Sequence, residues 1–295
     1  VLTYVNGSIY KGEFKDDLFH GKGIHTYTED LDVIKYEGNF KEDLRSGKGT
    51  LTYKNGTVYK GELKNNWEHG TGTMIYKEDP DGWLKYVGEW NDALEDGKGE
   101  LEFVNGDRYV GTFKKSRFHG NGTIIFSDGG KYEGEWKDGY RQGKGEYKYK
   151  SGSVYRGKFK KNEADGPGEL VFADGSTYTG EFKKGLMSGT GTLIYKDDNN
   201  GRLKYIGEFK DDLEHGQGTM HYANGETYTG IFKEGNELNR KSTVVKLTTN
   251  EKYYALIIGN NEYQHHEKLE AAVRDADEIS KILENKYGFE ITKLI

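Results

Sequence analysis

The chain contains no cysteine, so its 8 histidines are the residues that first suggest a catalytic base or a metal ligand. His265 and His266 are adjacent in the segment "NNEYQHHEKLEAAV". Adjacent side chains point apart in an extended chain, and neither a cysteine nor a third ligand lies nearby in the sequence. We therefore interpret the pair as part of a solvated loop, with a metal ligand and a catalytic base as the alternatives.

Four other histidines share one position, immediately before the first glycine of a Gly-x-Gly pair. They are His20, His69, His119 and His215, and other copies of the position hold Ser46, Asp96, Gln142, Asp165 and Ser188. A position that accepts all of these residue types is predicted to be a turn rather than a site. Asp275 opens a helical pattern, where a carboxylate interacts favourably with the helix dipole; a substrate-pocket role is the alternative. We predict no catalytic, cofactor-binding or metal-binding residue in this chain, and no cofactor.

The glycine pairs recur, and Gly-x-Gly is a spacing found in nucleotide-binding loops. The pairs are Gly21/Gly23, Gly47/Gly49, Gly70/Gly72, Gly97/Gly99, Gly120/Gly122, Gly143/Gly145, Gly166/Gly168, Gly189/Gly191 and Gly216/Gly218. Neither a third glycine nor a helical pattern follows them, which argues against a nucleotide-binding loop. Each pair is instead preceded by Tyr-x-Gly, at Tyr10, Tyr36, Tyr59, Tyr86, Tyr109, Tyr132, Tyr155, Tyr178 and Tyr205, and a tenth copy begins at Tyr228. So regular an arrangement identifies a repeat protein.

Each repeat is predicted to form two short strands, such as "TVYKGELK" at 57–64 and "GTGTMIY" at 70–76. Both alternate with period two and are rich in aromatic and β-branched residues, which is typical of strands. Pairs such as Asn55-Gly56 join successive repeats and supply the positive φ of tight hairpin turns. The glycines inside the strands are expected to offer bare backbone on which an aromatic ring can lie. The core is therefore predicted to be a thin aromatic stripe.

The order Tyr-x-Gly-x-Phe/Trp, then Gly-x-Gly, then an aromatic residue resembles the MORN repeat family. The resemblance covers residues 1–240 and rests on ten copies in register. It implies successive β-hairpins stacked into an elongated, twisted, single-layer sheet that serves as a scaffold in cytoskeletal, ciliary and membrane-associated settings. Because "VLTYVNG" at 1–7 aligns with "TLTYKNG" at 50–56, we expect the chain to begin inside a repeat of a longer polypeptide.

The C-terminal residues differ in pattern. We interpret residues 241–251 as a linker or capping strand, and residues 252–295 as the first βαβ unit of an incomplete domain. The apolar run from Tyr253 to Ile258 predicts a buried strand, and "HEKLEAAVRDADEISKILENKYGF" has the three- and four-residue spacing of an amphipathic helix. "FEITKLI" predicts a second strand, parallel to the first. The fold class is therefore mainly β, followed by the start of an α/β domain.

"YALIIGNNEY", "LEAAVRDADEISKIL" and "YGFEITKLI" together resemble the opening of the caspase and metacaspase superfamily of cysteine peptidases. The resemblance implies a Cys nucleophile and a His general base, both downstream of the segment present. This chain has no Cys and therefore cannot itself be a cysteine peptidase. In caspases proper, the resemblance further implies an Arg in the loop after the first strand that binds a substrate aspartate. The loop "NNEYQHHEKLEAAV" has no Arg before the helix, so cleavage after aspartate is not supported. Whether the complete protein is an enzyme stays open.

Composition limits the partners. The net charge of −6 gives no general attraction to nucleic acid, although stripes of lysine and aromatic residues leave local contact with anionic lipid open. No apolar run is long enough to span a bilayer, no signal peptide is visible, and the absence of Cys fits an intracellular location. We expect protein partners, with homo-oligomers as an option and with the cytoplasm, cytoskeleton, cilium or membrane periphery as locations.

Two hypotheses follow. In the first, the repeats are a protein-interaction and targeting scaffold attached to a caspase-like cysteine peptidase domain. In the second, the protein is a non-enzymatic structural component of a cytoskeletal or ciliary assembly with a degenerate caspase-like domain. A tether to membrane lipid is a third option.

Overall fold

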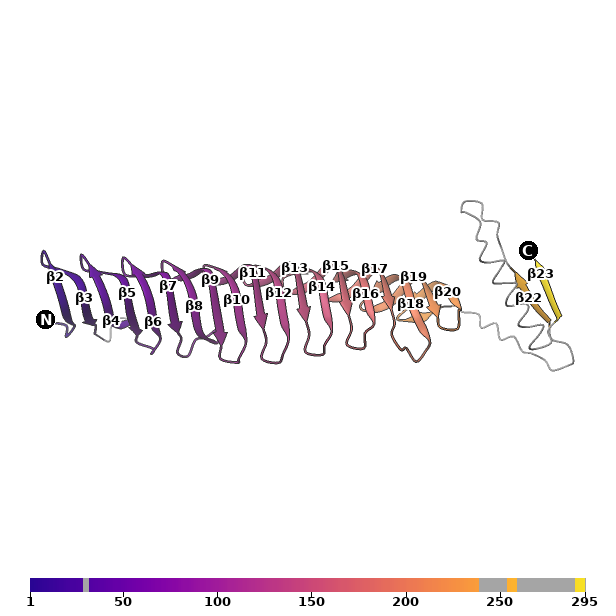
Figure 1. Ribbon diagram of the computed structural model, residues 1–295, viewed down its shortest axis with the longest axis horizontal. Coiled ribbons are helices and arrows are strands. Elements are labelled where there is room, and N and C mark those ends of the chain that lie inside the picture. The colour runs from indigo at the N-terminus through magenta and orange to yellow at the C-terminus, as the bar shows by residue number, and fades with distance from the viewer. Residues whose placement is uncertain (29–31, 239–253, 259–289, 295) are drawn as a thin grey trace. The chain divides into compact units, whose positions relative to one another are not determined.

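The computed structural model describes residues 1–28, 32–238, 254–258 and 290–294 (Figure 1). The chain divides into two units, Val1–Arg240 and Lys241–Ile295. The predicted linker at 241–251 and the predicted helix of the second unit lie outside the described residues.

The first unit is a single antiparallel sheet of 21 strands, in which each strand pairs with its neighbours in sequence. The strands that carry Tyr-x-Gly are β2 Ile9–Lys15, β4 Val33–Lys41, β6 Val58–Lys64, β8 Trp83–Asn91, β10 Arg108–Lys114, β12 Lys131–Lys137, β14 Val154–Lys160, β16 Thr177–Lys183, β18 Arg202–Lys210 and β20 Thr227–Lys233. The strands that carry Gly-x-Gly are β3 Leu18–Thr26, β5 Leu44–Tyr53, β7 Trp67–Ile75, β9 Leu94–Phe103, β11 Arg117–Ile125, β13 Tyr140–Lys148, β15 Glu163–Val171, β17 Leu186–Ile194 and β19 Leu213–Tyr222. Short strands β1 Leu2–Thr3 and β21 Asn236–Glu237 lie at the two ends.

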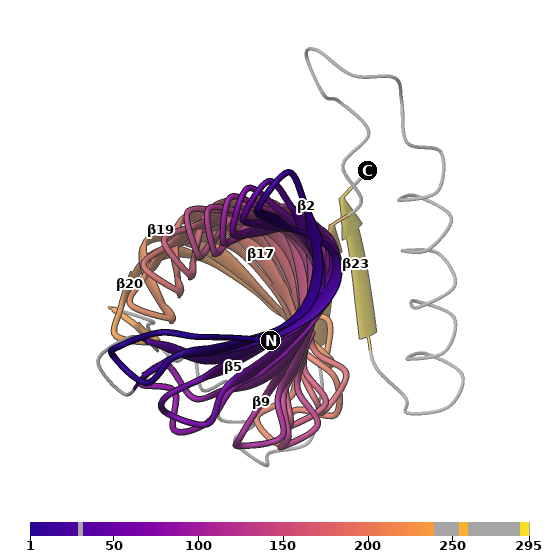
Figure 2. The ribbon, with the colours of Figure 1, turned by 90° about the vertical axis from the view of Figure 1, so that its left-hand side faces the viewer.

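The predicted hairpin array is confirmed, and the sheet coils along its length when it is viewed from its N-terminal end (Figure 2). The second strands begin earlier than predicted: β7, for example, starts at Trp67 rather than at Gly70. This extension brings the two strands of each repeat together at a two-residue turn. At Asn65-Asn66 both residues have positive φ, 50° and 75°, as a type I′ turn requires. Each repeat therefore has a tight turn between its own two strands. The predicted turns at the joints between repeats are also present, and Gly56 at one of them has φ 89°.

The two glycines of Gly-x-Gly have different tasks. Gly70 has φ 64° and lies where the register between β6 and β7 shifts, so it belongs to a β-bulge. Gly72 pairs with Gly61, and the ring of Tyr59 lies over both of them. A Cβ on Gly61 would lie 2.4 Å from Tyr59 Oη, and one on Gly72 would lie 2.3 Å from the same atom. The predicted cover of glycine backbone by an aromatic ring is thus confirmed.

The core consists of side chains on one face of this sheet. The tyrosine of each of the first nine repeats is at most 1% exposed. Tyr86, for example, packs edge-on against Trp90 of its own strand and against Phe113 of the next repeat, with centroids 5.2 and 4.9 Å apart. Its hydroxyl donates a hydrogen bond to the carbonyl oxygen of Glu89 at 2.9 Å, next to the bulge. Tyrosine suits this position because it both covers glycine and satisfies that carbonyl.

The second unit contains the predicted strands, β22 Tyr254–Ile258 and β23 Glu290–Leu294. They pair in parallel, with Tyr254 opposite Glu290 and Ile258 opposite Leu294. The parallel arrangement that the sequence predicts for these strands is therefore confirmed.

Candidate interaction surface

A continuous line of glycines crosses the sheet, with one glycine in every strand from β2 to β20. Each pairs with the next in the order Gly12, Gly23, Gly38, Gly49, Gly61, Gly72, Gly88, Gly99, Gly111, Gly122, Gly134, Gly145, Gly157, Gly168, Gly180, Gly191, Gly207, Gly218 and Gly230. The tyrosine rings cover this line on one face. On the opposite face the residues that flank each glycine project outward, because side chains alternate along a strand. The line of glycines is therefore the floor of a shallow trough on the face without tyrosines.

The residues on one side of this trough are aligned across the strands and are rich in threonine. We call them the threonine row: Lys11, Ile24, Glu37, Thr50, Lys60, Thr73, Val87, Glu100, Val110, Thr123, Glu133, Glu146, Arg156, Glu169, Thr179, Thr192, Ile206, Thr219 and Thr229. The opposite side holds mainly charged and amide residues, such as Lys48, Glu62 and Asn121. The trough is thus mainly polar on both sides, with Ile24, Val87, Val110 and Ile206 as apolar members of the threonine row.

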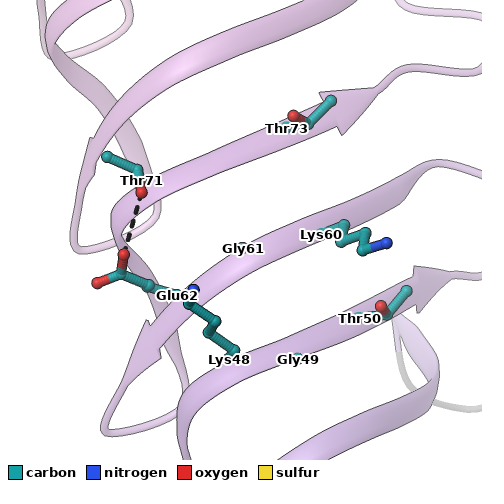
Figure 3. A pocket seen from close by; sticks show the side chains of 8 residues that line it. All are labelled: Lys48, Gly49, Thr50, Lys60, Gly61, Glu62, Thr71 and Thr73. Atoms are coloured by element: carbon teal, nitrogen blue, oxygen red, sulfur yellow. Dashed lines mark hydrogen bonds between the residues drawn. The ribbon is translucent and has the colours of Figure 1, made fainter.

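Three hollows lie along the trough, with volumes of about 480, 530 and 440 Å³. Figure 3 shows the first, around Gly49 and Gly61. Its other lining residues are Lys48, Thr50, Lys60, Glu62, Thr71 and Thr73. Thr71 Oγ1 donates a hydrogen bond to Glu62 Oε1 at 3.0 Å, which holds these two side chains on one side of the floor (Figure 3). The hollows are open and shallow, so they suit an extended surface contact better than the enclosure of a small molecule.

Several exposed ion pairs lie on this face. They include Lys35–Glu37 at 3.0 Å, Arg108–Glu100 at 2.5 Å, Lys131–Glu133 at 2.6 Å and Arg156–Glu146 at 2.7 Å. The hydrogen bond from Arg108 lowers the pKa of Glu100, although desolvation acts in the opposite direction. Exposed pairs of this kind contribute little to stability. They give the surface alternating charge instead, which favours recognition of a particular partner over general attraction.

The structure corrects one prediction about the histidines. His20 lies inside β3, opposite Glu13, and the equivalent His69 lies inside β7, so their shared position is not a turn. It directly precedes the bulge, where the side chain is partly exposed and many residue types fit. His69 Nδ1 lies 3.6 Å from Asp92 Oδ1. His265, His266 and Asp275 lie outside the described residues.

Metal binding and membrane spanning can be assessed for the part of the chain that the structure describes. No group of three or more His, Asp or Glu residues could hold a metal ion there. None of the described residues forms a helix with the length and apolar character needed to cross a bilayer. Sequence reasoning missed the trough because it depends on how the glycines align between strands, and their repeated spacing was the signal that could have revealed it.

Comparison with known families identifies two matches. The model of the MORN repeat matches residues 10–29, 36–58, 59–78, 86–108, 109–131, 132–154, 155–177, 178–199 and 205–227. This is one repeat fewer than the ten predicted, because the copy that begins at Tyr228 has no Gly-x-Gly strand. The caspase domain model matches residues 252–294. A search of curated proteins finds no match.

Solved structures resemble the chain only distantly. One is the SAS-4 (dCPAP) TCP domain of Drosophila melanogaster in complex with a proline-rich motif of Ana2, at 13% identity and a TM-score of 0.30, covering 63% of this chain and 84% of that one. Another is the TCP10 domain of Danio rerio CPAP, at 12% identity and a TM-score of 0.23, covering 78% of this chain and 92% of that one. At these values neither structure supports a functional parallel.

Proposed function

Since the chain belongs to the MORN repeat family, we propose that its array is a protein-interaction scaffold which positions an attached caspase-like domain. The observation that carries this proposal is the trough, which runs without interruption along 19 paired backbone positions between two rows of outward-pointing side chains. The backbone between the two rows of side chains is open to a partner on this face, and the polar side chains of both rows provide hydrogen-bond donors and acceptors along it. Such a surface suits a long partner and offers nothing that resembles a reaction centre.

The caspase-like domain attached to the array determines whether the complete protein is an enzyme. In the first version of the proposal, a complete caspase-like domain hydrolyses peptide bonds with a Cys and a His that lie outside this sequence, and the array directs it to its target. In the alternative, that domain is degenerate and the protein is a structural component of a cytoskeletal or ciliary assembly. Tandem mass spectrometry of the native polypeptide beyond Ile295 separates the two. A His and a Cys at the ends of further strands would favour the peptidase, and their replacement would leave the structural component.

The role of the trough is tested by filling it. In a tagged chain expressed in cells, Thr73→Arg with Thr192→Arg would place two long side chains on the glycine floor. Ser127→Arg with Asn200→Arg places the same side chains in connecting loops and is the matched control. We expect the trough variant to lose the partners that crosslinking mass spectrometry recovers with the unchanged chain, while the loop variant keeps them. If the folded trough variant keeps every partner, the proposed surface is wrong.

Location and membrane contact are part of the same proposal. We infer an intracellular site at the cytoskeleton or the cilium, because an elongated scaffold needs a fixed assembly on which to act. A lipid tether is the competing version, supported by exposed lysines such as Lys60 along the trough. Sedimentation with phosphoinositide-containing vesicles at moderate salt distinguishes them, since a chain that stays in the supernatant cannot be such a tether.

A further inference from the structure

The array contains two closely similar inserted loops, residues 77–82 between β7 and β8 and residues 196–201 between β17 and β18. The surrounding sequences, "YKEDPDGWLKYVGEW" from 76 and "YKDDNNGRLKYIGEF" from 195, align without gaps. Both loops close in the same way: Gly82 N donates to Asp79 O at 3.0 Å and Gly201 N donates to Asp198 O at 2.9 Å. The two copies can therefore be compared position by position.

In the second copy an arginine of the chain itself occupies a site built for a guanidinium group. Arg202 donates to both oxygens of Asp198, from Nη2 at 2.8 Å and from Nε at 3.2 Å. Its Nη1 lies 3.8 Å from Glu214 Oε1, and its Cζ lies 4.4 Å from the ring centroid of Tyr195. Glu214 is only 5% exposed and accepts a hydrogen bond from the Tyr195 hydroxyl. Two carboxylates and an aromatic face thus surround the cation.

The first copy keeps the three groups that hold this guanidinium but lacks the arginine. Tyr76, Asp79 and Glu95 stand where Tyr195, Asp198 and Glu214 stand in the other loop, and Glu95, 5% exposed, accepts a hydrogen bond from the Tyr76 hydroxyl. Trp83 replaces Arg202. Its ring meets the edge of the Tyr76 ring at an interplanar angle of 85°, with centroids 5.6 Å apart, and it contributes no positive charge.

A larger pocket results at the first loop. Its volume is about 640 Å³, against about 350 Å³ at the second loop. Ala93 lines it where the second copy has Asp212. The titratable groups that face it are Asp32, Glu78, Asp79 and Glu95 on the acidic side, Lys54 and Lys77 on the basic side, and Tyr53 and Tyr76. The acidic groups outnumber the basic ones, so the pocket favours a cation.

We propose that this pocket, formed by Tyr76, Asp79 and Glu95 with Trp90, binds an arginine side chain of a partner polypeptide in the position that Arg202 takes at the second loop. Arginine fits better than lysine because its planar fork can bond a carboxylate in two places while it lies on an aromatic ring. The site includes Met74 and Trp90, which lie on the tyrosine face of the sheet. It is therefore separate from the trough, and this inference does not depend on the function proposed for the trough.

The test uses the whole chain with its 3 methionines labelled on the methyl carbon, because Met74 lines the pocket. The probe is the blocked peptide acetyl-Gly-Arg-Gly-amide, and the matched control contains citrulline, which has the same shape without the charge. We expect the arginine peptide to shift the Met74 signal saturably, and the citrulline peptide to bind at least about tenfold more weakly. Free arginine is a third probe. If it binds as tightly as the peptide, the site serves a small metabolite and the partner-polypeptide proposal is overturned.

Two exchanges between the loops complete the test. Trp83→Arg should fill the first pocket from within and abolish the Met74 shift. Arg202→Trp should open the second pocket and raise the number of bound peptides from one to two. As a milder change, Glu95→Gln keeps the shape, removes the charge and should weaken binding about tenfold. Equal binding of arginine and citrulline, or full binding by a folded Trp83→Arg chain, would overturn the assignment.

Discussion

The ring of Tyr86 lies across Gly88, two residues further along the same strand, so closely that a Cβ on Gly88 would lie 2.4 Å from Tyr86 Oη. The same Cβ would lie 2.6 Å from Gly99 Cα, in the adjacent strand. The first neighbour is a buried ring and the second is backbone, so neither can move away without a change in the sheet. Every strand from β2 to β20 contains a glycine in this line, and the thin sheet consequently tolerates no side chain along it.

Gly88→Ala should therefore lower the free energy of unfolding by about 3 kcal/mol, the upper part of the range for an overpacked core. Urea denaturation followed by tryptophan fluorescence measures this loss. Val87→Ala is the control, because Val87 belongs to the same strand but points to the other face and is 42% exposed. Equal effects of the two substitutions would contradict the close contact between ring and glycine.

The tyrosine hydroxyls give a second prediction. Tyr109 Oη donates to the carbonyl oxygen of Thr112 at 3.0 Å, next to the bulge between β10 and β11. Tyr109→Phe keeps the ring but leaves that carbonyl without this donor, which should cost about 1–3 kcal/mol of unfolding free energy. Tyr140→Phe serves as the control, since Tyr140 is 49% exposed. A Tyr109→Phe chain as stable as the control would show that the ring alone accounts for the choice of tyrosine.

The repeated pattern was sufficient to predict the hairpins, the thin aromatic core and the cover of strand glycines by aromatic rings. Each of these depends on spacing within one repeat, which ten copies make unmistakable. The two-residue turn at Asn65-Asn66 was not predicted, because it contains no glycine. Its geometry depends on a bond to the preceding repeat, where Asn66 Oδ1 accepts from Arg45 N at 2.9 Å. No pattern within a single repeat contains that information.

The trough and the pocket at residues 77–82 were missed for a similar reason. Alternation along a strand separates the residues into two faces but does not show which glycines of different strands align. The pocket becomes visible only when two distant loops are compared in three dimensions. Trp83 and Arg202 occupy the same position in the aligned sequences. Glu95 is twelve residues further along the chain than Trp83, and only the folded sheet brings its carboxylate to the pocket.

Alkaline pH should unfold the array. Burial, the largest cause, raises the pKa of Tyr36, Tyr132 and Tyr178 to about 12, above the usual value of 10.0. A raised pKa means that the folded state holds its protons at pH values where the unfolded state releases them. The stabilisation is therefore complete below pH 10 and is lost as the pH rises through about 12, by about 1.4 kcal/mol per pH unit for each such tyrosine. Urea denaturation at stepped pH measures this slope, and unchanged stability between pH 10 and 12 would contradict it.

The turn between β8 and β9 is weaker than its counterparts and can be improved. Ala93 has φ 66°, a left-handed conformation that strains a residue with a Cβ. In equivalent turns the side chain accepts a hydrogen bond from the preceding repeat: Asn162 Oδ1 accepts from Arg141 N, and Asp212 Oδ1 from Met187 N, both at 2.8 Å. Ala93 has no such acceptor, although its backbone N donates to Glu68 O at 2.9 Å as Asn162 N does to Arg141 O at 3.1 Å.

Ala93→Asn should consequently raise the free energy of unfolding by about 1–2 kcal/mol, since asparagine tolerates this conformation and supplies the missing acceptor for Glu68 N. Ala93→Gly separates the two contributions, because glycine relieves the backbone strain without providing an acceptor. Urea denaturation of both variants should rank asparagine above glycine and glycine above the unchanged chain. If asparagine does no better than glycine, the bond between repeats adds nothing, and the stability of these turns depends on backbone conformation alone.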